Sequence, residues 1–268
     1  FAMCSSLSNI TIPDSVTSIE DYAFRNCTYL SSITFEGNAP TFGSDVFLNS
    51  DSVTIYYDSH YSGWSSTVAG RPAVQTNTLT FSLNDDGTGY SVSDCLESAS
   101  GSLDIPSSYN SLPVTSIGSN AFNSCYFIVG ITIPISVTSI GEAAFASCHG
   151  LTSILIPDSV TSIGVSAFNS CSTLSSVTIG NSITSIGSYT FIGCNSLTTI
   201  TIPSNITSIG EAAFVSCPSL SSVTFEGDAP TFGTEVFEGS DSVTITYDSN
   251  YSGWSSTIAG RPAVQANI

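Results

Sequence analysis

Apolar residues return at a fixed interval along most of this chain. From Phe122 onward, one series of phenylalanines and one series of cysteines recur every 23 residues (148 − 125 = 23 for Cys125 and Cys148). A fixed period of about 20–50 residues predicts a solenoid, in which each repeat buries its apolar side only against its neighbours. The predicted core positions are Phe122, Phe145, Phe168, Phe191 and Phe214, with Cys125, Cys148, Cys171, Cys194 and Cys217.

Within one repeat, the segments 151–157 (LTSILIP) and 160–164 (VTSIG) carry apolar residues at alternate positions and end at Pro or Gly. This pattern predicts two short strands, one on each side of a flattened coil. The segment 141–148 (GEAAFASC) is predicted to be a turn or a single helical turn. Because stacked strands lie about 4.8 Å apart, equivalent residues form ladders that can hydrogen-bond along the stack. The predicted ladders are Thr138, Thr161, Thr184 and Thr207, with Ser139, Ser162, Ser185 and Ser208 beside them.

A second, longer period contains the first. Residues 30–77 return almost unchanged as residues 220–267, an offset of 190 (220 − 30). Within these two segments the short repeat degrades, as is typical of terminal repeats that close an apolar end. The large aromatic residues Trp64 and Trp254 are the predicted lids of these closing caps.

The short repeat is lost altogether from Thr78 to Pro113. TLTFSLNDDGTGYSV reads as two strands around an Asn-Asp-Asp-Gly turn, which predicts a hairpin and an opening cap. Phe1 lies in mid-repeat, so we expect the chain to be a piece of a longer protein. The predicted organisation is residues 1–77 as the end of a first module with its closing cap, and 78–268 as a complete second module, with an opening cap (78–113), repeats (114–240) and a closing cap (241–268).

The repeat resembles the BspA-type leucine-rich repeats of bacterial and some protist surface proteins. The matching residues are Cys148, Leu151, Ile154, Ile156, Pro157, Ser159, Val160, Ile163, Gly164, Ala167, Phe168 and Cys171. Gly180 in place of proline and Ile128 in place of leucine are small departures. The resemblance implies a β-rich leucine-rich repeat solenoid, exposed at the cell surface or secreted, and some members of the family are adhesins for host or matrix proteins. It does not name a ligand.

Charge excludes several partners. The chain has 21 acidic and three basic residues, no lysine, and a formal net charge of −18. Nucleic acids and anionic membranes would be repelled, because binding to them depends on Lys and Arg. We therefore expect no nucleic-acid binding. No transmembrane run is visible, so we also expect no membrane insertion.

The eight cysteines leave three interpretations open. Disulfide bridges are common in extracellular chains, and a metal site is a third possibility. Seven of the cysteines share one repeat position, however, and side chains of a parallel ladder point the same way instead of at each other, which favours buried free thiols. Cys95 has no periodic partner and is the candidate reactive or cross-linking thiol.

Catalytic and cofactor signals are weak. His60 and His149 do not recur at their equivalent positions, so we expect no catalytic site and no cofactor. Asp85 and Asp86 lie in a Gly-rich turn that suits calcium but lacks full EF-hand spacing, and a purely structural turn is the favoured reading. A second set of carboxylates could cluster near the closing caps, either as a solvated face or as a cation site: Glu36, Asp45, Asp51, Asp58, Glu226, Glu235, Asp241 and Asp248.

Aromatic residues of the closing caps allow two roles. They can cover the last turn, or they can stack on sugars or dock a partner protein. These residues are Tyr56, Tyr57, Tyr61, Tyr247 and Tyr251, with the two tryptophans.

Two functions from different classes follow from the sequence. The first is a non-catalytic extracellular structural protein that forms a long tandem array or a head-to-tail filament. The second is a cell-surface adhesin that binds host or matrix proteins, or a glycan, through the repeat face. Since the repeat face reads as uniform Ser and Thr, the structural role is the preferred expectation.

Overall fold

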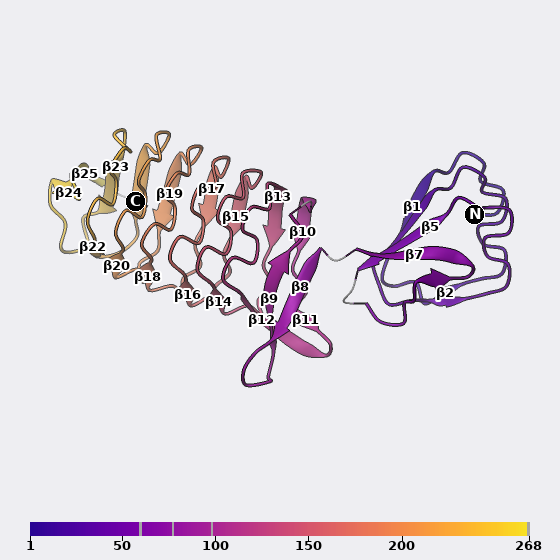
Figure 1. The fold of residues 1–268 in the computed structure, drawn as a ribbon. Helices are drawn as coiled ribbons and strands as arrows, with labels where there is room; N and C mark the ends of the chain where they lie inside the picture. Colours follow the sequence, from indigo (N-terminus) through magenta and orange to yellow (C-terminus); the bar gives the residue numbers. More distant parts are fainter. Residues whose placement is uncertain (59–60, 77, 98, 267–268) are drawn as a thin grey trace. The chain divides into compact units, whose positions relative to one another are not determined.

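The computed structural model describes residues 1–58, 61–76, 78–97 and 99–266. They form two compact units, Phe1–Thr78 (unit 1) and Leu79–Ile268 (unit 2), each a coil of short strands (Figure 1). All the elements in these residues are strands, so the segment predicted to be a turn or a helical turn contains no helix. The predicted β-rich solenoid is confirmed.

Unit 1 contains seven strands. A five-stranded sheet has the order β1-β3-β5-β7-β6, and β2 pairs with β4 on a second side of the coil. All pairs are parallel except the antiparallel pair β6/β7. The strands are β1 (Asn9–Ile12), β2 (Ser18–Ile19), β3 (Ser32–Phe35), β4 (Thr41–Phe42), β5 (Thr54–Asp58), β6 (Thr67–Val68) and β7 (Arg71–Thr76).

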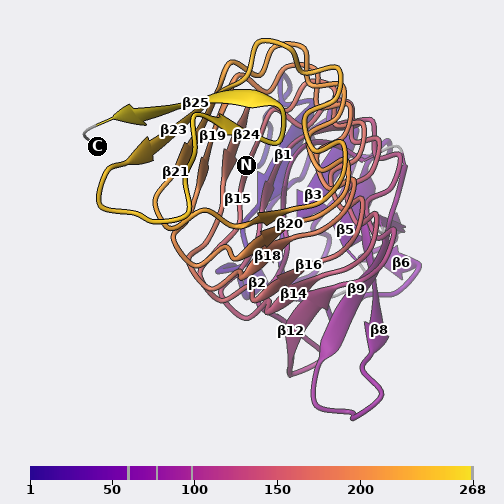
Figure 2. The ribbon, with the colours of Figure 1, turned by 90° about the vertical axis from the view of Figure 1, so that its left-hand side faces the viewer.

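Unit 2 contains the remaining strands, which alternate between two sides of the coil. Figure 2 shows these sides, with the turns stacked one behind another. The long-strand side consists of β10 (Ser100–Asp104), β13 (Phe127–Thr132), β15 (Ser153–Leu155), β17 (Ser176–Thr178), β19 (Thr199–Ile202), β21 (Ser222–Phe225), β23 (Thr244–Asp248) and β25 (Arg261–Ala266), with β24 (Thr257–Ile258) at its edge. The short-strand side consists of β8 (Leu79–Leu83), β9 (Tyr90–Cys95), β12 (Leu112–Ile117), β14 (Ser139–Ile140), β16 (Ser162–Ile163), β18 (Ser185–Ile186), β20 (Ser208–Ile209) and β22 (Thr231–Phe232), with β11 (Ser108–Tyr109) on β12.

The predicted hydroxyl ladders are present on the short-strand side, with one interruption between β16 and β18. Ser139 pairs with Ser162 in parallel register, and Thr161 donates its Oγ1 hydrogen to the carbonyl of Thr138, 3.2 Å away. Thr207 makes the equivalent bond to Thr184. β-branched side chains therefore bond directly between successive turns.

The third side is made of turns because each repeat has two residues there with left-handed backbone. In one repeat these are Ala143 and Ser147, with φ of 50° and 60°. This conformation breaks the helical hydrogen-bond pattern and directs N–H groups toward the next turn. The N–H of Phe145 donates to Ala167 O at 2.8 Å, and that of Ser147 to Asn169 O at 2.7 Å. Apart from one irregular turn in unit 2, the turns are thus bonded to one another on all three sides.

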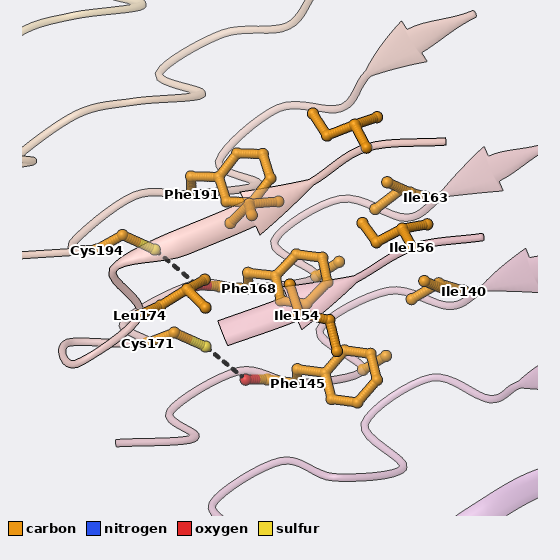
Figure 3. Packing of buried hydrophobic residues seen from close by; sticks show 14 of the residues in the cluster. Ile140, Phe145, Ile154, Ile156, Ile163, Phe168, Cys171, Leu174, Phe191 and Cys194 are labelled. Atoms are coloured by element: carbon orange, nitrogen blue, oxygen red, sulfur yellow. Dashed lines mark hydrogen bonds between the residues drawn. The ribbon is translucent and has the colours of Figure 1, made fainter. Parts of the chain in front are cut away.

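The core consists of columns that run through the stack, as Figure 3 shows. Phe145, Phe168 and Phe191 are stacked with ring centroids 5.1 and 5.5 Å apart, and all three are fully buried. Beside them, the thiols of four cysteines each donate to the carbonyl of the phenylalanine in the preceding turn, for example Cys171 Sγ to Phe145 O at 3.0 Å. The four are Cys148, Cys171, Cys194 and Cys217. Ser240 replaces the cysteine in the last turn and makes the same bond to Phe214 O at 2.7 Å.

The opening segment of unit 2 extends the coil although its sequence has left the repeat. β8 and β9 form the predicted antiparallel hairpin. β9 then pairs with β12, and β10 pairs with β13. This segment therefore supplies the first strand to each of the two sides.

The closing caps of the two units have the same contacts. Trp254 stacks on Tyr247, with centroids 4.7 Å apart, and lies 4.9 Å from the ring of Phe225. Trp64 makes the equivalent contacts in unit 1. Arg261 donates to the carbonyl of Phe237 and pairs with Asp241 at 2.8 Å. One cation thus satisfies a terminal carbonyl at the end of the stack.

One turn of unit 2, residues 174–190, departs from the regular stacking. Among the described strands, β16 does not pair with β18, nor β17 with β19. A Cβ on Gly180 would lie 2.6 Å from Pro157 O, whereas one on Gly187 would be 3.6 Å from the nearest atom of Gly164. This irregular turn therefore approaches the preceding turn closely at one corner and stands away from it at another.

Candidate contact surface

Five exposed apolar side chains lie on the first two repeats of unit 2. Phe127 is 62% exposed, Leu155 60% and Ile135 84%, with Val129 and Tyr126 also exposed. We call Tyr126, Phe127, Val129, Ile135 and Leu155 the contact stripe. Large apolar side chains exposed together, unlike scattered ones, indicate an interaction surface.

The stripe is positioned by the long-strand side. In β13, Phe127 and Val129 point outward while Ile128 and Ile131 are buried. The in–out alternation of side chains shifts at Val129, where the register with β10 is irregular. Leu155 occupies the outward position of β15, the next strand of the same sheet. In Figure 1, β13 and β15 are neighbours near the opening end of unit 2.

The same positions carry polar or small residues in the other repeats of unit 2. Phe127 corresponds to Gly150, Thr173, Ser196 and Ser219, and Val129 to Thr152, Ser175, Thr198 and Ser221. Leu155 corresponds to Thr132, Thr178, Thr201 and Thr224, and Ile135 to Asp158, Asn181 and Ser204. The fold therefore does not require these apolar side chains.

An aromatic pair lies at the end of the stripe where β13 begins. The Tyr126 and His149 rings stack with centroids 5.3 Å apart. His149 Nδ1 lies 2.9 Å from the carbonyl oxygen of Ser170, which identifies Nδ1 as the donor. His149 is thus held by stacking and by a backbone contact.

Carboxylates flank the other end. Asp104 is exposed on β10, directly opposite Thr132 of β13. Asp158 is exposed at the position equivalent to Ile135, one turn later. The stripe is therefore an apolar strip with a negative border.

The expectation of a uniform Ser and Thr face was wrong for this part of unit 2. The sequence does mark these residues, because they are apolar at repeat positions where most other repeats carry Ser or Thr. Only the structure shows that these positions face outward.

The predicted core residues lie inside the stack. The five phenylalanines and five cysteines of the unit 2 columns are all buried. All eight cysteines are free thiols in this structure. Burial raises the pKa of Cys217 to about 11 and those of Cys148 and Cys194 further.

Cys95, the predicted reactive thiol, is also buried, at the end of β9. Its pKa is raised first by a hydrogen bond with the thiol of Cys125 and then by burial. It is not a surface thiol.

The Asp85–Asp86 turn has an internal role. Asp86 Oδ1 accepts the N–H of Thr88 at 3.0 Å and its hydroxyl at 2.8 Å, and these bonds lower the pKa of Asp86. Among the described residues, no group of three or more His, Cys, Asp or Glu side chains could hold a metal ion. His60 lies outside the described residues.

The carboxylates of the closing caps separate into different environments. Asp51 and Asp241 each pair with an arginine. Glu226 and Asp248 line a shallow hollow of about 350 Å³ together with Tyr251. The side chain of Asp58 is outside the described part of the structure.

Among the described residues, no helix is long and apolar enough to cross a membrane.

Comparisons with known proteins agree with the repeat pattern. Six copies of the BspA type leucine-rich repeat region match residues 1–67 and 115–244. No curated protein matches the chain. Among solved structures, the leucine-rich repeat protein of T. pallidum is 25% identical, with a TM-score of 0.52 over 62% of this chain and 88% of that one.

Two further solved structures have lower identity. A leucine-rich repeat protein from Eubacterium ventriosum ATCC 27560 is 21% identical, with a TM-score of 0.50 over 89% of this chain and 78% of that one. A leucine rich cell surface protein from Faecalibacterium prausnitzii A2-165 is 22% identical, with a TM-score of 0.36 over 90% and 79%. The Eubacterium ventriosum match shows a similar fold and nothing about a ligand.

Proposed function

The chain belongs to the BspA-type leucine-rich repeat family, and from this premise we propose that it is a non-catalytic extracellular scaffold that binds a partner protein through the contact stripe. The observation that carries this proposal is the exposure of Phe127, Val129 and Leu155 where the other repeats carry Ser, Thr or Gly. The extracellular location comes from the family resemblance alone.

The chemistry of the stripe defines the partner. Aromatic and aliphatic side chains at the centre of an interface supply most of its binding energy. The negative border at Asp104 and Asp158, and the net charge of −18, favour a partner that surrounds its apolar residues with Lys and Arg. A second copy of this chain would bring like charges together and is the less favoured occupant.

The residues of neighbouring repeats supply the test. In the stripe variant, Phe127→Ser, Val129→Thr and Leu155→Thr are combined, each introducing a residue that another repeat already carries at that position. A control variant combines Thr178→Ser, Thr201→Ser and Thr224→Ser on the outward face of later strands. The probe is a fluorescent peptide that alternates leucine and lysine, titrated by anisotropy at low and high salt.

Wild type and control should bind the peptide, more weakly at high salt, and the stripe variant should lose at least tenfold in affinity. Equal binding by the stripe variant would contradict the proposal, as would no binding by the wild type. A wild-type dimer that the stripe variant no longer forms would assign the stripe to self-association instead.

Head-to-tail assembly, inferred from the 190-residue repeat, stays a prediction. Negative-stain images of native material with thin fibres of constant axial repeat would support it. Single particles with a solution mass near 27.8 kDa would contradict it.

A further inference from the structure

The first cysteine of the unit 2 column differs from those that follow it. Cys148, Cys171, Cys194 and Cys217 each donate to a phenylalanine carbonyl in the preceding turn, at 3.0–3.3 Å. Cys125 has no such phenylalanine before it. Its Sγ lies 3.7 Å from Cys95 O and 3.8 Å from Leu96 O instead.

Cys95 reaches the same point from a different element. Its Sγ lies 3.7 Å from Leu96 O, so the two sulfurs converge on one carbonyl oxygen. A hydrogen bond between the two thiols is also the first cause of the raised pKa of Cys95 and of the lowered pKa of Cys125. Both residues are buried.

We propose that Cys95 and Cys125 are the site of a disulfide that fastens the opening hairpin of unit 2 to its first repeat. The objection to bridges within the cysteine column does not apply to this pair, because Cys95 belongs to β9 and not to the parallel ladder. The column thiols that follow are directed at backbone carbonyls. One bond between Cys95 and Cys125 therefore leaves those contacts intact.

The chemistry is thiol–disulfide exchange with a low-molecular-weight disulfide, RSSR, as oxidant. The thiolate of one cysteine attacks a sulfur of RSSR, which gives a mixed disulfide and releases RS⁻. The thiolate of the second cysteine then attacks the protein sulfur of the mixed disulfide and releases a second RS⁻. The two cysteine protons end on the released thiols, so two RSH form for each RSSR reduced.

The bond would close a loop between residues 30 positions apart in the chain. Such a link restricts the unfolded chain more than the folded one. It would also hold the chain next to the contact stripe, because Tyr126 follows Cys125 directly. The proposal does not depend on what the stripe binds.

The experiment counts thiols in the full chain. Reduced protein is refolded from urea with oxidised glutathione at pH 8, then denatured and alkylated with N-ethylmaleimide. Intact mass should show two of the eight thiols protected, and chymotryptic peptides should contain a Cys95–Cys125 link. The oxidised form should melt about 5 °C or more above the reduced form.

Two variants make the result specific. Cys95→Ser should abolish the link, whereas Cys171→Ala should keep it. Eight alkylated thiols after oxidation, a link between column cysteines, or glutathione adducts without a link would each overturn the proposal.

Discussion

Replacing Phe168 by alanine removes a ring from the middle of the unit 2 phenylalanine column. The ring is fully buried, with neighbouring rings centred 5.1 and 5.5 Å away. Phe→Ala substitutions in a core cost about 3–5 kcal/mol, and each stacked pair adds about 0.5–1.5 kcal/mol beyond area. Because the turns on both sides are hydrogen-bonded to this one on the third side, the cavity cannot readily collapse. We therefore expect about 4–5 kcal/mol.

Urea unfolding followed by circular dichroism measures this loss. Phe127→Ala is the control, because it removes the same ring from an exposed site and should change the free energy of unfolding by no more than about 0.5 kcal/mol. A loss below about 1.5 kcal/mol for Phe168→Ala would refute the reasoning, since the column would then not be a packed core. Equal losses in the two variants would also refute it.

Three further predictions test the stacking of turns. Gly164→Ala should destabilise unit 2 by about 1–3 kcal/mol in thermal melts, because its Cβ would lie 2.4 Å from a backbone nitrogen. Gly187→Ala is the control: its Cβ would make only ordinary contacts, so the melting temperature should hardly change. Ser240→Ala should cost about 1–3 kcal/mol in urea unfolding, because a buried carbonyl and a buried N–H lose their partner, whereas Ser240→Cys should retain most of the stability. Hydrogen bonds from Ser252 lower the pKa of Asp228. The ionised carboxylate therefore stabilises the fold at pH values above its unfolded pKa, and this stabilisation is lost as the pH falls through its folded pKa. Asp228→Asn should keep the melting temperature at pH 7, since Asn38 accepts the same bond in unit 1, and should reduce the fall in melting temperature below about pH 4.

The regular part of the fold was predictable because its determinants are periodic. The 23-residue spacing of Cys125 and Cys148 was sufficient for the solenoid, and the family resemblance is confirmed. The absence of a helix was not decided by sequence, since it depends on left-handed residues such as Ala143 that no propensity rule marks.

The candidate site was harder to predict. Phe127 looks like any apolar residue until its column is known to face outward. Cys95 had no periodic partner, so its contact with Cys125 required the path of the opening hairpin in space. Departures from a repeat become informative only when burial is known for each column.

The irregular turn also determines how unit 2 would respond to mechanical force. A pull along the stack loads the hydrogen bonds between turns one row at a time, so the coil unravels repeat by repeat. Each repeat of 23 residues releases roughly 75–80 Å of extended chain. Residues 174–190 lack a strand pair to one neighbour on each strand side, so we expect unravelling to begin at this turn. The repeats that carry the contact stripe precede this turn, and we expect them to stay folded while the chain beyond it extends.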